Sequence, residues 1–504
     1  MVCRPSDFIT QLDKAADEKW LTYDADNIHV NLPAKHEYLF LRGNTNISEH
    51  LRDGILEVAF HAPCSEIISA IVSVFDQDKK RLFNKLIPPG GEERIPICDH
   101  PQAATFRVGL RLKGVGVCSF EKITIGSAVS SNVLILSNQY PSYDDLYKYM
   151  FVHTRVKAYQ KLGYNHTVMR HHLHCANNIR EFEAVQVLEG DSEVLASVLA
   201  SGKINTVCAH FFDENKFEVV QPYLENIRLI IWLHGNEIQP YWRREWNHNS
   251  EDELARARRG TVRKIVFWSK LFELAKTNKI HFVFVSEYFK NEVFCDYNVN
   301  LPPHMYSIIH NPINTDLFCY NTKPAELRKN IISIRSFTSY KYANDLTVKT
   351  ILELSQYDEF RDMSFHIGGV GPMFDEIVEP LRNFPNVTLA NRFYNQTEMS
   401  ELYKTSGICL IPTRMDSQGV TRDEAMASGL VPVTNSVAAV PEFVDSTCGI
   451  LAPAEDHIEM AAGILEMYRN PKKFQELSKN AAARVRKQSA ADVVSVKEIA
   501  VIQN

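Results

Sequence analysis

The sequence predicts an α/β protein in which two consecutive doubly wound domains follow an all-β sandwich. Short runs of alternating apolar residues, separated by turn clusters, fill residues 27–126, and this pattern is typical of a sandwich. From residue 131 onward, buried strands alternate with amphipathic helices, which is typical of parallel α/β units. A length of 504 residues is enough for about three domains.

The elements are expected in a definite order along the chain. A helix at residues 7–20, capped by Ser6, precedes the sandwich. Strands are then expected at 133–137, 165–171, 206–212, 228–235, 281–287 and 306–312 in the first α/β unit, and at 330–336, 363–369, 386–392, 407–413 and 430–435 in the second. Helices follow from about residue 456. We therefore expect domains at 1–129, 130–318 and 319–504, the first with an accessory, carbohydrate-binding role by analogy of fold alone.

Charge and cysteine usage exclude several classes of protein. A net charge of −6 and a pI near 6.3 argue against nucleic acid as the main partner. The ten cysteines contain no C-x-x-C pair and indicate buried thiols in a reducing compartment. The first residues lack the apolar core of a signal peptide, and no apolar run is long enough to span a membrane. We expect a cytoplasmic protein, with attachment to the inner face of a membrane left open.

The stretch RMDSQGVTRDEAMASGLVPVTN, residues 414–435, carries the strongest functional signal. Asp416 follows a buried strand, Gly419 lets backbone approach a ligand, and Thr421 or Arg422 opens a helix with Glu424 in its first turn. The N-terminus of such a helix attracts anions, and carboxylates on either side of it suit hydroxyl groups. This order of parts matches a nucleoside diphosphate sugar. Taken alone, the two carboxylates could also merely cap the helix.

This stretch resembles the donor-site signature of retaining glycosyltransferases of the GT-B fold, in particular glycosyltransferase family 4. The matching positions are Pro412, Asp416, the run from Glu424 to Gly429, and Pro441-Glu442. Asp416 stands where the family has Glu, which shortens the reach of the carboxylate by one methylene. The resemblance covers roughly residues 131–485. It implies that Glu424 holds the donor ribose and that Asp416, with the amides of Gly419 and Val420, positions the donor sugar.

The same resemblance assigns further donor-side residues. Arg335 and Lys341 match the pair that clamps the donor diphosphate, with a spacing one residue longer than expected, and two fixed cations would stabilise a leaving diphosphate without a metal. Arg392 and Phe393 match the nucleobase side, and His234 matches a catalytic-site histidine that faces the donor sugar. Each also has a plainer interpretation: a surface cation, a core aromatic or a structural histidine.

The acceptor side departs from the family pattern. Many relatives have a Gly-Gly loop after the first strand, whereas this chain has SNQYPSYDDLYKYM. Tyr143, Asp144 and Asp145 in this loop suit stacking on a sugar acceptor and hydrogen bonding to it. A helix start with aromatic packing is the alternative.

The function predicted from these features is transfer of a sugar from a nucleoside diphosphate donor to a hydroxyl of a glycan or glycolipid. We expect no cofactor and no metal, since the D-x-D pairs Asp24/Asp26 and Asp76/Asp78 lie outside the α/β units. The basic amphipathic stretch 255–279, with Val262, Ile265, Val266, Ser269 and Phe272 on one face, could contact a membrane or simply pack on its domain. A glycan-binding protein, a sugar-nucleotide epimerase and a phosphorylase remain alternatives on the same fold.

Overall fold

The computed structural model of this chain describes residues 2–3, 20–24, 27–41, 45–47, 55–63, 65–127, 129, 131–143, 145–146, 148–173, 178–248 and 250–504. The expected helix at 7–20 and its cap Ser6 lie outside these residues. The chain divides into two compact units: residues 1–139, 165–207 and 215–227 form the first, and residues 140–164, 208–214 and 228–504 form the second. The domain boundaries expected from the sequence stay predictions.

The first unit contains the expected antiparallel sandwich. One sheet has the order β1 (Val2–Cys3), β10 (Lys122–Ser127), β5 (Ile55–His61) and β8 (Glu92–Pro96). The other has the order β2 (Leu21–Asp24), β3 (Asn27–Phe40), β9 (Ala103–Ser119), β6 (Ile68–Asp76) and β7 (Arg81–Ile87), with β4 (Thr45–Asn46) beside β9. Residues from both sheets, among them Val58, Val72 and Leu110, are fully buried in one apolar core, although β6 is buried at consecutive positions as well. The strands that the alternation predicted therefore fill this core from both sheets.

The first unit also contains strands of the first α/β sheet. β11 (Val133–Ser137), β12 (Thr167–His171) and β14 (Val185–Gly190) pair in parallel, and β13 (Asn178–Phe182) pairs antiparallel with β14. Helix α4 (Ser192–Ala200) begins after Asp191, whose carboxylate caps it. β15 (Thr206–His210) and α5 (Glu214–Val220) belong partly to each unit. The hairpin of β13 and β14 was not predicted from the sequence.

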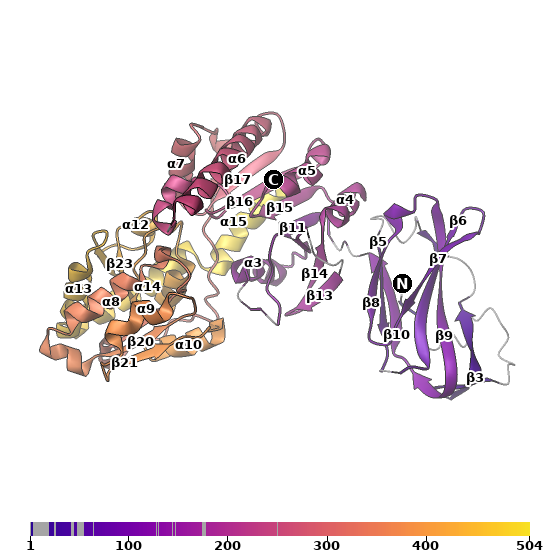
Figure 1. Cartoon of the computed structure of the whole chain (residues 1–504), viewed down its shortest axis with the longest axis horizontal. Coiled ribbons are helices and arrows are strands. Elements are labelled where there is room, and N and C mark those ends of the chain that lie inside the picture. Colours follow the sequence, from indigo (N-terminus) through magenta and orange to yellow (C-terminus); the bar gives the residue numbers. More distant parts are fainter. Residues whose placement is uncertain are drawn as a thin grey trace. The chain divides into compact units, whose positions relative to one another are not determined.

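In the second unit, three parallel strands form what we call the β16 layer: β16 (Arg228–Leu233), β17 (Ile280–Phe284) and β18 (Tyr306–Ile308). The helices of this part are α3 (Met150–Lys161), α6 (Glu251–Ala275) and α7 (Glu287–Asp296). The last helix of the chain, α15 (Ala491–Gln503), contacts α3, as the yellow ribbon beside the magenta elements in Figure 1 shows. The Glu498 carboxylate, fully buried, accepts hydrogen bonds from Arg155 and Tyr159 of α3 at 2.8 and 2.7 Å.

The six-stranded parallel sheet of the second unit is a complete doubly wound sheet. Its order is β21 (Val387–Ala390), β20 (Ser364–Gly368), β19 (Asn330–Ile334), β22 (Ile408–Leu410), β23 (Val431–Asn435) and β24 (Ile450–Ala452). Numbered along the chain, this is the order 3-2-1-4-5-6 of dinucleotide-binding domains. The helices that accompany it are α8 (Asn344–Leu354), α9 (Phe374–Val378), α10 (Gln396–Lys404), α11 (Val420–Ala427), α12 (Val440–Phe443), α13 (His457–Arg469) and α14 (Pro471–Gln488). Ligands of such sheets bind where the order reverses, between β19 and β22.

Candidate functional site

Two segments that were predicted to bind the donor meet at the reversal point of the six-stranded sheet. β19 and β22 are paired there, and the chain leaves both strands at their carboxyl ends. The segment after β19 carries Arg335 and Lys341, and the segment after β22 carries Asp416. Topology therefore brings these side chains to one edge of the sheet although they lie far apart in sequence.

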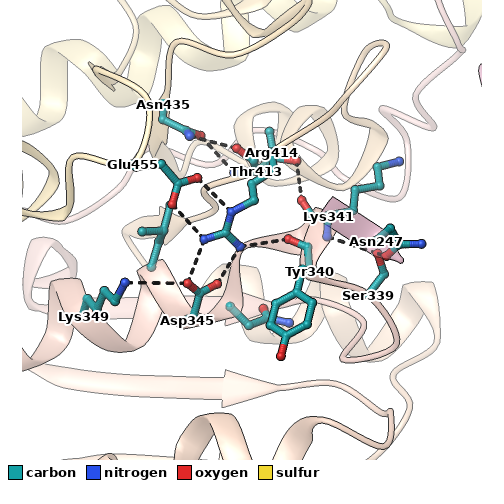
Figure 2. Close-up of polar contacts among 12 residues, drawn as sticks. Asn247, Ser339, Tyr340, Lys341, Asp345, Lys349, Thr413, Arg414, Asn435 and Glu455 are labelled. Carbon is teal, nitrogen blue, oxygen red and sulfur yellow. Dashed lines mark hydrogen bonds and ion pairs between the residues drawn. The ribbon is translucent and has the colours of Figure 1, made fainter. Parts of the chain in front are cut away.

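Arg414 fastens the two segments to each other (Figure 2). Its guanidinium makes two hydrogen bonds to Asp345, at 2.7 and 2.8 Å, and two to Glu455, both at 2.8 Å. It also donates to the Tyr340 carbonyl at 3.0 Å, and its backbone N–H donates to the Lys341 carbonyl at 2.9 Å. The hydrogen bonds to the two carboxylates hold the pKa of Arg414 above its usual value. The loop that carries Lys341 is thus fixed beside the loop that carries Asp416.

Lys341 and Arg335 form the positive side of the site. The Lys341 side chain extends away from the Arg414 cluster in Figure 2. Burial lowers the pKa of Lys341, the Asp416 carboxylate opposes this effect, and the charges of Arg244 and Arg335 add to it. The charges of Asp416, Arg244 and Arg335 therefore all act on the Lys341 ammonium group.

Arg335 is buried with an unused donor. Its side chain is 8% exposed and its guanidinium lies 5.0 Å from the centre of the Tyr342 ring. Among the described residues, its buried Nε has no hydrogen-bond partner. A buried cation in this condition is costly unless a ligand anion completes it. The arrangement favours a phosphate-bearing ligand.

Helix α11 starts directly after Gly419. Gly419 is the N-cap residue with φ of 101°, and a Cβ there would lie 3.1 Å from an Asp416 carboxylate oxygen. Because the left-handed glycine ends the loop, the helix begins at Val420, one residue earlier than Thr421. The expectation that Glu424 lies in the first turn is therefore wrong: Asp423 holds that place and Glu424 follows it.

Gln418 anchors the loop between Asp416 and α11. Its side-chain amide accepts a hydrogen bond from the Asn311 N–H at 2.5 Å and donates one to the Asn311 carbonyl at 3.1 Å. Both backbone groups of Asn311 are therefore paired, as they would be with a neighbouring strand. The same amide nitrogen donates to Asp423 at 3.0 Å, and Arg422 donates to Asp423 at 2.7 Å. Gln418, Arg422 and Asp423 are almost fully buried. They hold the backbone of the site rather than its ligand.

The Glu424 carboxyl group is buried and accepts a hydrogen bond from one neighbouring side chain. Its side chain accepts a hydrogen bond from the Gln396 amide at 2.9 Å and is 6% exposed as a residue. Burial raises the pKa of Glu424 from 4.5 to about 8, against the effect of the Gln396 hydrogen bond. Without a ligand, the carboxyl group therefore holds its proton at neutral pH. Gln396, which sequence reasoning did not single out, orients the group that was predicted to hold the ribose.

The predicted nucleobase-side residues lie just before α10. Arg392 stacks on the Tyr394 ring, 3.8 Å from its centre, and pairs with Glu398 at 2.8 Å. Phe393 is 37% exposed, so it is not a core residue. Gln396, three residues after Phe393, donates its hydrogen bond to Glu424, so this segment contacts the predicted ribose-binding residue.

His234 stands at the carboxyl end of β16, with its ring among aromatic side chains. Its Nε2 lies 3.0 Å from His210 Nδ1, and its ring stacks on Phe211 with 4.8 Å between centres. Burial and the charge of Arg155 hold the pKa of His234 well below its usual value, so the ring is neutral. The Ser417 hydroxyl donates to the His234 carbonyl at 2.8 Å. The structure therefore brings the His234 turn next to the loop of Asp416.

The Pro441-Glu442 motif connects the six-stranded sheet with the β16 layer. The Glu442 carboxylate accepts hydrogen bonds from the backbone N–H groups of Glu287, at 3.0 Å, and of Tyr288. Both amides belong to the first turn of α7, where the helix dipole favours a carboxylate.

The predicted acceptor-side residues are only partly described. Tyr143 is 65% exposed, and Asp145 pairs with Lys148 at 3.0 Å. Asp144 lies outside the described residues. The acceptor role of this loop stays a prediction.

No group of three or more His, Cys, Asp or Glu side chains among the residues that the structure describes could hold a metal ion. In that part of the chain, no helix combines the length and the apolar character needed to cross a membrane. On α6, Val262 and Val266 are 63% and 65% exposed whereas Phe272 is buried. Burial therefore divides the predicted face, because Phe272 belongs to the buried stripe with Trp268 whereas Val262 and Val266 stay exposed.

Comparisons with known proteins agree with this fold. Residues 328–470 match the family described as Glycosyl transferases group 1, while no curated protein sequence matches the chain. Sucrose-phosphate synthase from Thermosynechococcus elongatus is 13% identical with a TM-score of 0.55, covering 74% of this chain and 98% of that one. HepE from Anabaena in complex with UDP is 13% identical with a TM-score of 0.53, covering 74% and 99%. The UDP-forming trehalose-phosphate synthase from Burkholderia vietnamiensis is 12% identical with a TM-score of 0.52, covering 74% and 98%. The predicted GT-B fold and the predicted resemblance to group 1 glycosyltransferases are confirmed.

Proposed function

We propose that this chain, a GT-B protein with a Glycosyl transferases group 1 segment at residues 328–470, is a retaining glycosyltransferase. It transfers a sugar from a nucleoside diphosphate donor to a hydroxyl of a glycan or lipid-linked acceptor. The observation that carries the proposal is the cluster of Arg335, Lys341 and Asp416 at the reversal point of the sheet. Cations beside a carboxylate suit a diphosphate joined to a sugar.

The chemistry follows from what each group can do. Glu424 accepts hydrogen bonds from the ribose hydroxyls, and Asp416 with the Gly419 and Val420 amides positions the donor sugar. Arg335 and Lys341 stabilise the charge that grows on the diphosphate as its bond to the sugar C1 breaks. The acceptor oxygen forms the new bond to C1 from the leaving-group side, and its proton passes to the departing phosphate. The reaction needs no protein nucleophile and no metal.

A binding panel followed by transfer assays tests this function. Thermal unfolding is measured with UDP, GDP, ADP, CMP and phosphate, and one nucleoside diphosphate is expected to stabilise the protein by roughly 2.7 kcal/mol at 100 times its dissociation constant. With the sugar nucleotide of that base, Lys341→Ala and Glu424→Ala should abolish transfer. Lys349→Ala is the matched control, because that lysine is exposed and its pair with Asp345, at 3.9 Å, is a long one. Unchanged transfer in both site variants would contradict the proposal.

A setting at a membrane surface is part of the proposal. Around Val262 and Val266, α6 exposes Arg259, Arg263 and Lys270, a combination that suits the headgroups and acyl boundary of an anionic leaflet. An enzyme held there would reach lipid-linked acceptors of surface polysaccharide assembly from the cytoplasmic side. Co-sedimentation with vesicles that contain phosphatidylglycerol, absent with phosphatidylcholine alone and lost in Arg259→Glu/Arg263→Glu, is the expected result. Equal binding of both vesicle types would contradict this setting.

A further inference from the structure

Arg244 follows β16 in the chain, and no carboxylate of the described residues forms a salt bridge with its guanidinium, although the charges of Glu237 and Glu292 favour its protonated form. It stands between the short turns η3 (Tyr241–Arg243) and η4 (Glu245–Asn247). Its donors reach the Gln239 side-chain oxygen at 2.6 and 3.1 Å and the Asn236 side-chain oxygen at 3.1 Å. Both acceptors are neutral amides, so the hydrogen bonds orient the guanidinium and leave its charge in place. Gln239 is held in turn by its donation to Glu292 at 2.6 Å.

The guanidinium lies directly over the His234–Gly235 turn. A Cβ at residue 235 would meet an Arg244 terminal nitrogen at 3.3 Å and the Gln239 side-chain oxygen at 3.2 Å. Gly235 also has φ of 137°, a conformation that favours glycine. A glycine at this position therefore makes room for Arg244 beside His234.

The loop that carries Arg244 also touches the loop that carries Lys341. η4 packs against η7 (Tyr340–Tyr342), and the Ser339 hydroxyl donates to the Asn247 side-chain oxygen at 2.6 Å (Figure 2). The positive charges of Arg244 and Arg335 both lower the pKa of Lys341. Arg244, Arg335 and Lys341 are therefore three cations in one cluster. The Asp416 carboxylate in the same cluster favours the charged form of Lys341. The Asp416 and Glu237 carboxylates offset part of the repulsion among these cations, and a bound anion would offset more of it.

We propose that Arg244 is a further anion-binding residue, which contacts the donor diphosphate from the segment after β16 while Arg335 and Lys341 contact it from the segment after β19. The inference rests on the proposed function. A diphosphate carries enough negative charge to neutralise the cluster, and an arginine fork fits two of its oxygens at once. Contact from both segments would hold the leaving group along its length as its charge develops.

Arg243 offers a matched control for this inference. It is the neighbouring residue, but three hydrogen bonds at 2.8, 3.0 and 3.2 Å neutralise it against Asp296. Calorimetry would compare the wild type, Arg244→Gln, Arg244→Lys and Arg243→Gln. The ligands are the nucleoside diphosphate that binds the wild type in the panel above and the corresponding nucleoside. The ratio of the two affinities does not depend on the fraction of folded protein.

The expected result is a selective loss. Arg244→Gln should weaken diphosphate binding at least 10-fold with unchanged nucleoside binding, Arg244→Lys should recover part of the loss, and Arg243→Gln should match the wild type. An unchanged affinity ratio in Arg244→Gln overturns the inference, whether both affinities stay or both fall, because a purely structural role changes both alike. A wild type that binds no nucleoside diphosphate would instead overturn the proposed function itself.

Discussion

Glu424→Gln should change how the stability of the protein depends on pH. In the ligand-free chain, burial raises the pKa of Glu424 from 4.5 to about 8. The folded state therefore binds this proton more tightly than the unfolded state does. The resulting stability is fully present below about pH 4.5 and is lost as the pH rises to about 8. Glutamine has no proton to lose, so its unfolding free energy lacks this decline.

The size of the effect follows from the same pKa. At roughly 1.36 kcal/mol per pKa unit, the wild type should lose up to about 5 kcal/mol relative to Glu424→Gln across this pH range. For a domain of this size, each kcal/mol corresponds to about 2–4 °C in thermal midpoint. About 3.5 kcal/mol of this loss falls between pH 5 and pH 8, so the midpoint of the variant should rise relative to that of the wild type by about 7–14 °C over that range.

Scanning calorimetry at several pH values measures the difference directly. Glu401→Gln is the control, because that carboxylate is 64% exposed and pairs with Lys404 on the surface of α10. The midpoint difference for the control should stay constant. If the difference for Glu424→Gln were also constant, Glu424 would be ionised in the folded protein, and the account of its burial would be refuted.

Three further results are expected. Arg414→Gln leaves Asp345 and Glu455 without their shared cation, so steady-state kinetics should show a kcat for transfer that is lower by about 10-fold or more. Arg414→Lys should recover part of that loss. A full rate in Arg414→Gln would contradict the positioning role of Arg414. Glu498→Gln leaves Arg155 buried without its counter-charge, and urea unfolding should show a loss of about 3–5 kcal/mol, whereas an unchanged midpoint would argue against a buried pair. Nucleoside diphosphate binding at pH 7 should release a proton, because ribose hydroxyls that donate to Glu424 favour its charged form. Calorimetry in buffers of different ionisation enthalpy measures this proton release, and equal binding enthalpies in all buffers would exclude it.

Most of the α/β part of the fold could be predicted because its strands are continuous apolar runs. The strands around Ile135, Ile231 and Val433 are buried on both faces, so their sequences differ sharply from the helices between them. The hairpin of β13 and β14 escaped prediction because Glu183 and Ala184 turn it with φ of 47° and 62°. Neither residue type signals a left-handed turn as Asn-Gly does. β24 spans only Ile450–Ala452 and offers too short a run to recognise.

The candidate site was predictable to the extent that its residues follow strands. Lys341 and Asp416 could be found because sequence places each of them just after an apolar run. Arg244 and Gln396 could not, because their positions depend on contacts with distant segments, such as the hydrogen bond between Asn247 and Ser339. The start of α11 was misplaced for a local reason, since only the left-handed backbone of Gly419 defines it.

The burial of Glu498 against α3 also concerns how the chain is made. Arg155 and Tyr159 emerge from the ribosome more than 300 residues before the carboxylate that they bind, and Trp232 also donates to that carboxylate at 3.0 Å. At about 5–20 residues per second, synthesis of the intervening chain takes tens of seconds. During that interval Arg155 of α3 lacks the carboxylate that pairs with it in the folded protein. These contacts must wait until α15 has been synthesised, so nascent chains should depend on chaperones until α15 is released.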